Sequence, residues 1–205
     1  MINLRRVLVH QFGNPRGLLG RLAGLIMTVR PSNRERILKT IELLDVRPDD
    51  CLLEVGFGPG LGIERALQLA SRGLVVGVDH SELMLRQAGR RNARALANGQ
   101  ARLLLGSAER LAEIPTRYDK VFAVNVYLFW DKPVAMLRDL RNVMSPGGVI
   151  ALTTQPRNRG ASIEDTRKVA DLMSASLSDA DFQEVRIEIL SMRPVPAACV
   201  LGKVS

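Results

Sequence analysis

Residues 52–60 have the sequence Leu52-Leu53-Glu54-Val55-Gly56-Phe57-Gly58-Pro59-Gly60, a short apolar run that leads into three glycines at alternate positions. The apolar run predicts a buried strand, and apolar residues at helical spacing beyond it, such as Ile63, Ala66 and Ala70, predict a helix over residues 62–71. A buried strand that enters a glycine-rich turn and then a helix is typical of an open α/β sheet, where ligands bind beyond the carboxyl ends of the strands.

The spacing of these glycines disfavours two common nucleotide sites. A dinucleotide fingerprint, G-x-G-x-x-G, counted from Gly56 needs its third glycine at Leu61, whereas Gly60 falls one residue early. A phosphate-binding loop needs Gly-Lys-Ser or Gly-Lys-Thr after the turn, and neither follows. The glycines still permit positive φ and close approach to a ligand, and the first N–H groups of the next helix add positive potential.

Short apolar runs and amphipathic stretches alternate along the rest of the chain, which predicts an α/β, doubly wound, mostly parallel sheet with helices on both faces. We expect strands at 51–55, 74–78, 102–105, 120–126 and 149–153, helices at 62–71, 81–97 and 133–144, and Asp131 as the N-cap of the last helix. A further helix at 163–177 precedes strands at 184–190 and 197–203, whose short connection requires an antiparallel edge.

Two carboxylates stand at the ends of the first two predicted strands. Asp79 is expected beside the glycine loop, where a carboxylate can accept hydrogen bonds from both hydroxyls of a ribose. The alternative role for Asp79 is an N-cap on the helix that starts near Ser81. Glu54 is costly to bury unpaired, so we expect an ammonium group or several backbone N–H groups to meet it.

Length and composition fit one folded domain: the chain has 205 residues, 46% hydrophobic and 24% charged. Residues 18–29 are apolar but contain Arg21 and are shorter than the roughly 20 residues that span a bilayer. Residues 5–11 lack the apolar core of a secretory signal, so we expect a cytoplasmic protein without a transmembrane segment. The two cysteines, Cys51 and Cys199, form neither a disulfide framework nor a metal site by themselves, and we expect no metal.

Most of the net charge of +8 lies near the N-terminus. Residues 1–39 carry one acidic group, Glu35, against eight basic groups: Arg5, Arg6, Arg16, Arg21, Arg30, Arg34, Arg36 and Lys39. Three helical patterns, broken at residues 13–15 and 31–33, precede the first strand of the sheet. We therefore expect an N-terminal helical cap over residues 1–45 that contributes to a substrate pocket, and a ligand-binding domain over residues 46–205.

Taken together, these motifs resemble the class I S-adenosylmethionine-dependent methyltransferases, in particular their small-molecule branch of type 11. The resemblance covers about residues 40–153 and keeps the order and spacing of the motifs. It rests on residues 52–60, on 77–81 with Met84, on 106–109 with Leu111, on 118–125 and on 137–150. It implies a Rossmann-like, seven-stranded sheet with an antiparallel last strand, and S-adenosylmethionine as the cofactor.

The resemblance also implies roles for individual residues. The glycine loop would wrap the methionine part of the cofactor, Glu54 would meet its amino group and Asp79 its ribose. Asn125 would lie near the sulfonium. The adenine would be flanked by His80 and Met84 and would accept a hydrogen bond from the main chain of Ala108. The loop residues meant here are Gly56, Phe57, Gly58 and Gly60.

One position departs from the family pattern. Ser107 stands where the family usually has an aspartate that accepts a hydrogen bond from the adenine amino group. A serine oxygen can accept that bond without a charge, and Glu109 is the alternative acceptor, although a solvated carboxylate at a helix start explains it equally well.

Candidates for contact with the methyl acceptor are few. His10 could accept a proton, although methyl transfer from a sulfonium is an in-line displacement that does not require a general base. Tyr127 and Trp130 follow the predicted fourth strand and could stack on an acceptor. The structural alternatives are an exposed polar residue for His10 and packing against the cap for the two aromatic residues.

Three functions are compatible with these features. The first, which we favour, is methyl transfer to a small, anionic or amphiphilic molecule that enters beneath the cap. The second is RNA methylation with the basic cap as a phosphate-binding surface, although no base-modifying signature follows the fourth strand. The third is a cofactor-binding scaffold without catalytic activity.

Overall fold

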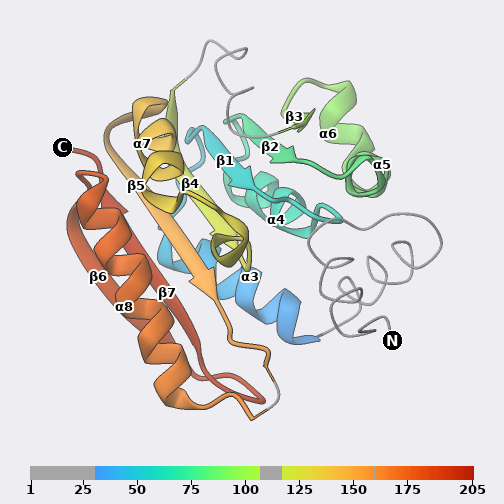
Figure 1. Cartoon of the computed structure of the whole chain (residues 1–205). Coiled ribbons are helices and arrows are strands. Elements are labelled where there is room, and N and C mark those ends of the chain that lie inside the picture. The colour runs from blue at the N-terminus through green and yellow to red at the C-terminus, as the bar shows by residue number, and fades with distance from the viewer. Residues whose placement is uncertain (1–30, 107–116, 159) are drawn as a thin grey trace.

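The computed structural model describes residues 31–106, 117–158 and 160–205, which fold around one seven-stranded sheet (Figure 1). The strand order is β3-β2-β1-β4-β5-β7-β6. The strands are β1 (Leu52–Val55), β2 (Val75–Asp79), β3 (Ala101–Leu105), β4 (Tyr118–Val124), β5 (Met144–Thr154), β6 (Gln183–Leu190) and β7 (Ala197–Lys203). β1 to β5 are parallel and β7 is antiparallel to both of its neighbours, which confirms the predicted fold class and edge.

Helices cover both faces of the sheet. The helical elements are α3 (Pro31–Leu43), α4 (Leu61–Leu69), α5 (Glu82–Arg91), α6 (Ala93–Ala97), the 3₁₀ turn η2 (Tyr127–Phe129), α7 (Pro133–Asn142) and α8 (Ile163–Asp179). Buried residues of α7 and α8 share one core with the sheet, and those of α3, α4 and α5 share the other (Figure 1). This two-core arrangement explains why β1, β2 and the middle of β4 are buried on both faces.

The part of the predicted cap that the structure describes is α3, and it packs directly on the sheet. Ile37, Ile41 and Leu44 are buried in the same core as α4 and α5. The hydroxyl of Thr40 lies 2.6 Å from that of Thr153 on β5. Residues 1–30 lie outside the described part of the chain, so the rest of the predicted cap stays a prediction.

The structure differs from the sequence prediction at several boundaries, among them those of α5, α7 and β5. The helix predicted over 81–97 is two helices, because Asn92 takes a non-helical conformation between α5 and α6. Lys132, not Asp131, is the N-cap of α7, and it makes no side-chain capping bond. β5 begins at Met144 rather than 149, because residues 145–148 form an irregular part of the strand, at which its register with β4 shifts.

Candidate functional site

The candidate site lies where the strand order reverses, between β1 and β4. The chain moves from β1 outward to β2 and β3, and then crosses back to β4 and β5. The connections after β1 and β4 therefore diverge and leave a crevice beyond their carboxyl ends, which is the usual ligand position in such sheets. The glycine loop (residues 56–60) follows β1, Asp79 ends β2 and Asn125 follows β4.

The glycine loop has the conformation that its glycines make accessible. The φ angles of Gly56, Gly58 and Gly60 are 76°, 50° and 84°, all in the left-handed region that side chains other than glycine rarely adopt. A Cβ on Gly56 would overlap Val126, whereas a Cβ on Gly58 would meet no described heavy atom within 4 Å. The prediction of positive φ in this loop is confirmed.

Asp79 connects the end of β2 to this loop. Its Oδ2 accepts a hydrogen bond from the Gly58 N–H at 2.9 Å, and its Oδ1 accepts one from the Ser81 N–H at 2.9 Å. The side chain that caps α5 is Ser81, which accepts a bond from the Met84 N–H at 3.4 Å, so the alternative N-cap role for Asp79 is wrong. Burial raises the pKa of the Asp79 carboxyl, which is 6% exposed, while the two main-chain bonds oppose that shift.

Glu54 is buried next to the loop and is short of partners. The residue is 2% exposed, and its Oε2 has no hydrogen-bond partner among the described residues. Burial, and secondly the charge of Asp79, raise the pKa of Glu54 well above its ordinary value, although a hydrogen bond from the Ile63 main chain opposes the shift. The sequence predicted an ammonium group or several N–H groups at this carboxyl, and within the described residues the main-chain N–H of Ile63 meets it, so the site retains capacity for a positively charged group.

Gly62 is a residue of this site that the sequence analysis missed. A Cβ on Gly62 would lie 2.5 Å from the Glu54 Cδ, so only glycine leaves room for the carboxyl group against the start of α4. The sequence signal that could have indicated this role was a glycine within a predicted helix, because glycine destabilises a helix by about 1 kcal/mol relative to alanine.

The residues predicted at the adenine lie in different environments. His80 has a half-exposed side chain whose Nδ1 is 3.9 Å from the Asp79 Oδ1. Met84 is buried in the same core as Phe57, whose side chain packs against Gly77. The predicted contact of Phe57 with the cofactor is therefore confined to its main chain. Ser107, Ala108 and Glu109 lie outside the described residues, and their roles stay predictions.

Asn125 bridges the carboxyl ends of β4 and β5. Its φ of 59° ends β4 at Val124, two residues before the predicted end. The Asn125 N–H donates to the Thr153 carbonyl at 2.7 Å, and its Oδ1 accepts from the Gln155 N–H at 3.1 Å. The residue at the predicted sulfonium end is therefore held by one main-chain bond to β5 and by one side-chain bond to Gln155, which follows β5.

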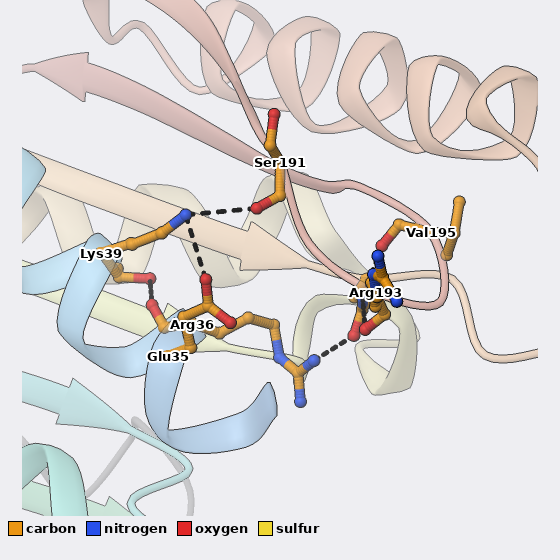
Figure 2. Close-up of polar contacts among 8 residues, drawn as sticks. Glu35, Arg36, Lys39, Ser191, Arg193 and Val195 are labelled. Carbon is orange, nitrogen blue, oxygen red and sulfur yellow. Dashed lines mark hydrogen bonds and ion pairs between the residues drawn. The ribbon is translucent and has the colours of Figure 1, made fainter. Parts of the chain in front are cut away.

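Gln155 links this edge to α3 and to the β6–β7 connection. Its Nε2 donates to the carbonyls of Arg193 and Val195, at 3.2 and 2.6 Å, and its Oε1 accepts from the buried guanidinium of Arg36. Figure 2 shows Arg36 and Lys39 extending from α3 toward this connection, with the Lys39 Nζ donating to the Ser191 carbonyl at 3.2 Å. No sequence signal marked Gln155, because its partners are distant in the chain.

The structure describes two of the three residues predicted to contact the methyl acceptor, Tyr127 and Trp130. Tyr127 is buried, its hydroxyl donates to the Leu172 carbonyl at 3.1 Å and it lies 2.8 Å from the Ser176 hydroxyl. Its ring meets that of Trp130 edge to face, with centroids 5.8 Å apart. Tyr127 therefore packs against α8, and its hydroxyl group is hydrogen-bonded there. Packing against residues 1–30 of the predicted cap stays a prediction, because these residues lie outside the described part of the chain. His10 lies outside the described residues.

Neither a membrane-spanning helix nor a metal-binding cluster is found in residues 31–106, 117–158 and 160–205. None of the described helices is long and apolar enough to cross a bilayer. No group of three or more histidine, cysteine, aspartate or glutamate side chains in this part of the chain could hold a metal ion.

Comparison with known proteins identifies the family. Residues 52–148 match the methyltransferase domain family. The chain is 33% identical over 182 residues to the uncharacterized methyltransferase YdaC of Bacillus subtilis (strain 168), an alignment that covers 89% of this chain and 97% of the relative. The chain therefore belongs to the methyltransferase domain family, as its motifs predicted.

Solved structures agree with this fold. A SAM-dependent methyltransferase from Aquifex aeolicus superposes with a TM-score of 0.65 at 19% identity, over 86% of this chain and 94% of that one. The N-methyltransferase NodS from Bradyrhizobium japonicum WM9, in complex with S-adenosyl-L-homocysteine, superposes with a TM-score of 0.67 at 14% identity, over 98% of both chains.

Proposed function

We propose that this methyltransferase transfers the methyl group of S-adenosylmethionine to a small molecule that is anionic or amphiphilic. The bound cofactor supplies a methyl group on a sulfonium. Because the leaving group is a neutral thioether, the protein contributes mainly by positioning the acceptor against the methyl group. The observation that carries the proposal is the pairing, at one edge of the sheet, of a cofactor-type site with positive charge from α3.

The buried carboxylates fit the cofactor. Glu54 Oε2, without a partner among the described residues, suits the ammonium of an amino acid, because an uncompensated buried carboxylate gains most from an opposite charge. Asp79 already accepts two main-chain bonds, and each of its oxygens keeps a lone pair for a ribose hydroxyl. The open space beside Gly58 allows a ligand to approach the main chain of the loop.

The acceptor side combines basic and apolar groups. Arg36 is buried and bonded to Gln155, whose main chain holds Asn125, so its charge adds positive potential at the carboxyl ends of β4 and β5. Leu128 and Phe129, which follow Asn125 on η2, are 60% and 54% exposed. An acceptor with an acidic group and an apolar body is complementary to both features.

A labelling experiment tests this function. The full-length protein is incubated with S-adenosylmethionine labelled in the methyl group and with a cell extract divided into a small-molecule fraction and an RNA fraction. We expect label in the small-molecule fraction, retained by an anion exchanger. Label in RNA would contradict the proposed acceptor and support the RNA alternative, and binding of cofactor without transfer to either fraction would support the scaffold alternative.

A further inference from the structure

The C-terminal end of α5 lies against the glycine loop. Asn92, 5% exposed, donates from its Nδ2 to the Gly60 carbonyl at 3.1 Å and to the Ala88 carbonyl at 3.0 Å. Arg91 donates from its Nε to the Pro59 carbonyl at 3.0 Å, and its Nη1 lies 3.1 Å from the Glu64 Oε2. Two neighbouring side chains therefore hold two neighbouring carbonyls of the loop, 32 residues away in the sequence.

The contact between α5 and the loop is too close for any side chain at Gly60. An added Cβ would lie 2.7 Å from both the Ala88 Cβ and the Asn92 Nδ2. On its other side the loop is held by Asp79, which accepts from the Gly58 N–H. The loop is therefore fixed between a predicted ligand-binding carboxylate and the end of α5.

External bonds matter in this segment because glycine has more conformational freedom to lose than any other residue. Three glycines in five positions leave a loop that, without such bonds, samples several conformations. A ligand that binds one of these conformations then binds more weakly, in proportion to the fraction of chains that hold it.

We propose that Asn92 and Arg91 are positioning residues that fix the glycine loop in its cofactor-binding conformation. They act through the Gly60 and Pro59 carbonyls and not through contact with the ligand. The inference rests on the proposed function, in which the loop holds the methionine part of the cofactor and the adenosine is bound by other residues.

This division of the ligand gives a readout that distinguishes positioning from general stability. S-Adenosylhomocysteine contains the amino-acid part, and methylthioadenosine has the same adenosine without it. Loss of the loop conformation weakens the first ligand and spares the second. General destabilisation of a chain that is still folded at the assay temperature changes neither, and damage to the whole site weakens both.

The experiment is calorimetric titration of both ligands into the full-length protein and three variants. Asn92→Leu removes the two donors at similar volume, and Arg91→Met removes the guanidinium from a partly exposed site, where folding is not at risk. The control is Asn98→Leu, since Asn98 caps α6 as Asn92 caps α5 but donates from its Nδ2 to exposed Gln100.

We expect Asn92→Leu to weaken S-adenosylhomocysteine binding about tenfold and Arg91→Met about threefold, in line with the loss of one hydrogen bond to the loop in each variant. Methylthioadenosine should change less than about twofold in both, and Asn98→Leu should behave as the unaltered protein. Equal loss of both ligands, or unchanged affinity for S-adenosylhomocysteine in Arg91→Met, would overturn the positioning role and leave the proposed function intact. Failure of the unaltered protein to bind S-adenosylhomocysteine would contradict the proposed function itself.

Discussion

At the scale of single residues, the site depends on two buried carboxylates on adjacent strands. Glu54 is on β1 and Asp79 ends β2, and the negative charge of Asp79 adds to the effect of burial on Glu54. Both groups have a raised pKa, so each favours its protonated form more than an exposed carboxyl does. A ligand that brings an ammonium group and ribose hydroxyls would relieve this cost, which is why the pair suits a cofactor with both.

Replacement of Asp79 tests its ribose role. Asp79→Ala should weaken S-adenosylhomocysteine binding roughly 10- to 100-fold, because two charge-assisted hydrogen bonds are lost. Isothermal calorimetry measures the effect. The matched control is Asp119→Ala, because Asp119 accepts a hydrogen bond from the Cys51 N–H at the opposite end of the sheet and should affect only stability. Unchanged affinity in a folded Asp79→Ala protein would remove Asp79 from the ribose site.

Glu54 should make the stability of the cofactor-free protein fall as pH rises. Its pKa is raised in the folded chain, so between the ordinary glutamate pKa of about 4.3 and the raised value the folded state holds a proton that the unfolded state has released. The free energy of unfolding therefore decreases with pH in that window, and Glu54→Gln should flatten the profile. Urea unfolding from about pH 5 to 8 measures this. Parallel profiles for the two proteins would mean that Glu54 is ionised in the folded chain.

At the scale of elements, the start of α4 is shaped by the carboxyl group that it covers. Gly62 lies in its first turn, where alanine would favour the helix by about 1 kcal/mol but would collide with Glu54. Helix propensity and local packing therefore oppose each other at this position.

Gly62→Ala should destabilise the protein by about 1–3 kcal/mol, because the added methyl group displaces Glu54. Gly89→Ala is the matched control: Gly89 is within α5, where an added Cβ meets no described atom within 4 Å, so this change should stabilise the protein by about 0.5–1 kcal/mol. Chemical denaturation compares the two. Stabilisation by both substitutions would show that the carboxyl group does not need the space at Gly62.

Periodicity predicted most elements because local sequence determines them. The run 52–55 and the pattern after it identified β1 and α4, and the short connection after β6 identified the antiparallel edge. The predictions failed where tertiary contacts determine the local structure or the partner of a side chain. Asn92 breaks the helix that was expected to continue to residue 97 and bonds the glycine loop instead, and the Tyr127 hydroxyl bonds α8. Local patterns carry no information on such distant partners.

At the scale of the whole molecule, the proposed function assigns cofactor binding and acceptor binding to two halves of one edge of the sheet. β1 and β2 present the predicted cofactor groups, while β4, β5 and the β6–β7 connection meet α3 through Gln155. Motif spacing predicted the first half of this edge, because the glycine loop and Asp79 are adjacent to their strands. The second half depends on contacts among four separate segments, three of which contribute side chains and one of which contributes main-chain carbonyls. The cytoplasmic location stays a prediction.

Charge reversal in the predicted cap tests the acceptor assignment at this scale. Arg16→Glu with Arg21→Glu should leave the affinity for S-adenosylhomocysteine largely unchanged, because no motif places these residues near the adenosine, while transfer to an anionic acceptor should fall. Enclosed ion pairs respond weakly to salt, whereas binding to RNA weakens steeply and log-linearly as counterions are released. A gel shift of RNA at physiological salt that disappears in the variant would contradict the small-molecule assignment.

The most direct test of the central claim is a calorimetric titration of the full-length protein with S-adenosylhomocysteine and, separately, with NAD. The glycine spacing and Asp79 predict a Kd of roughly 1–10 μM for S-adenosylhomocysteine and no measurable heat of binding for NAD. Binding of NAD in that range, or no binding of S-adenosylhomocysteine at ligand concentrations up to about 1 mM, would contradict the claim that this edge of the sheet is a methyl-donor site.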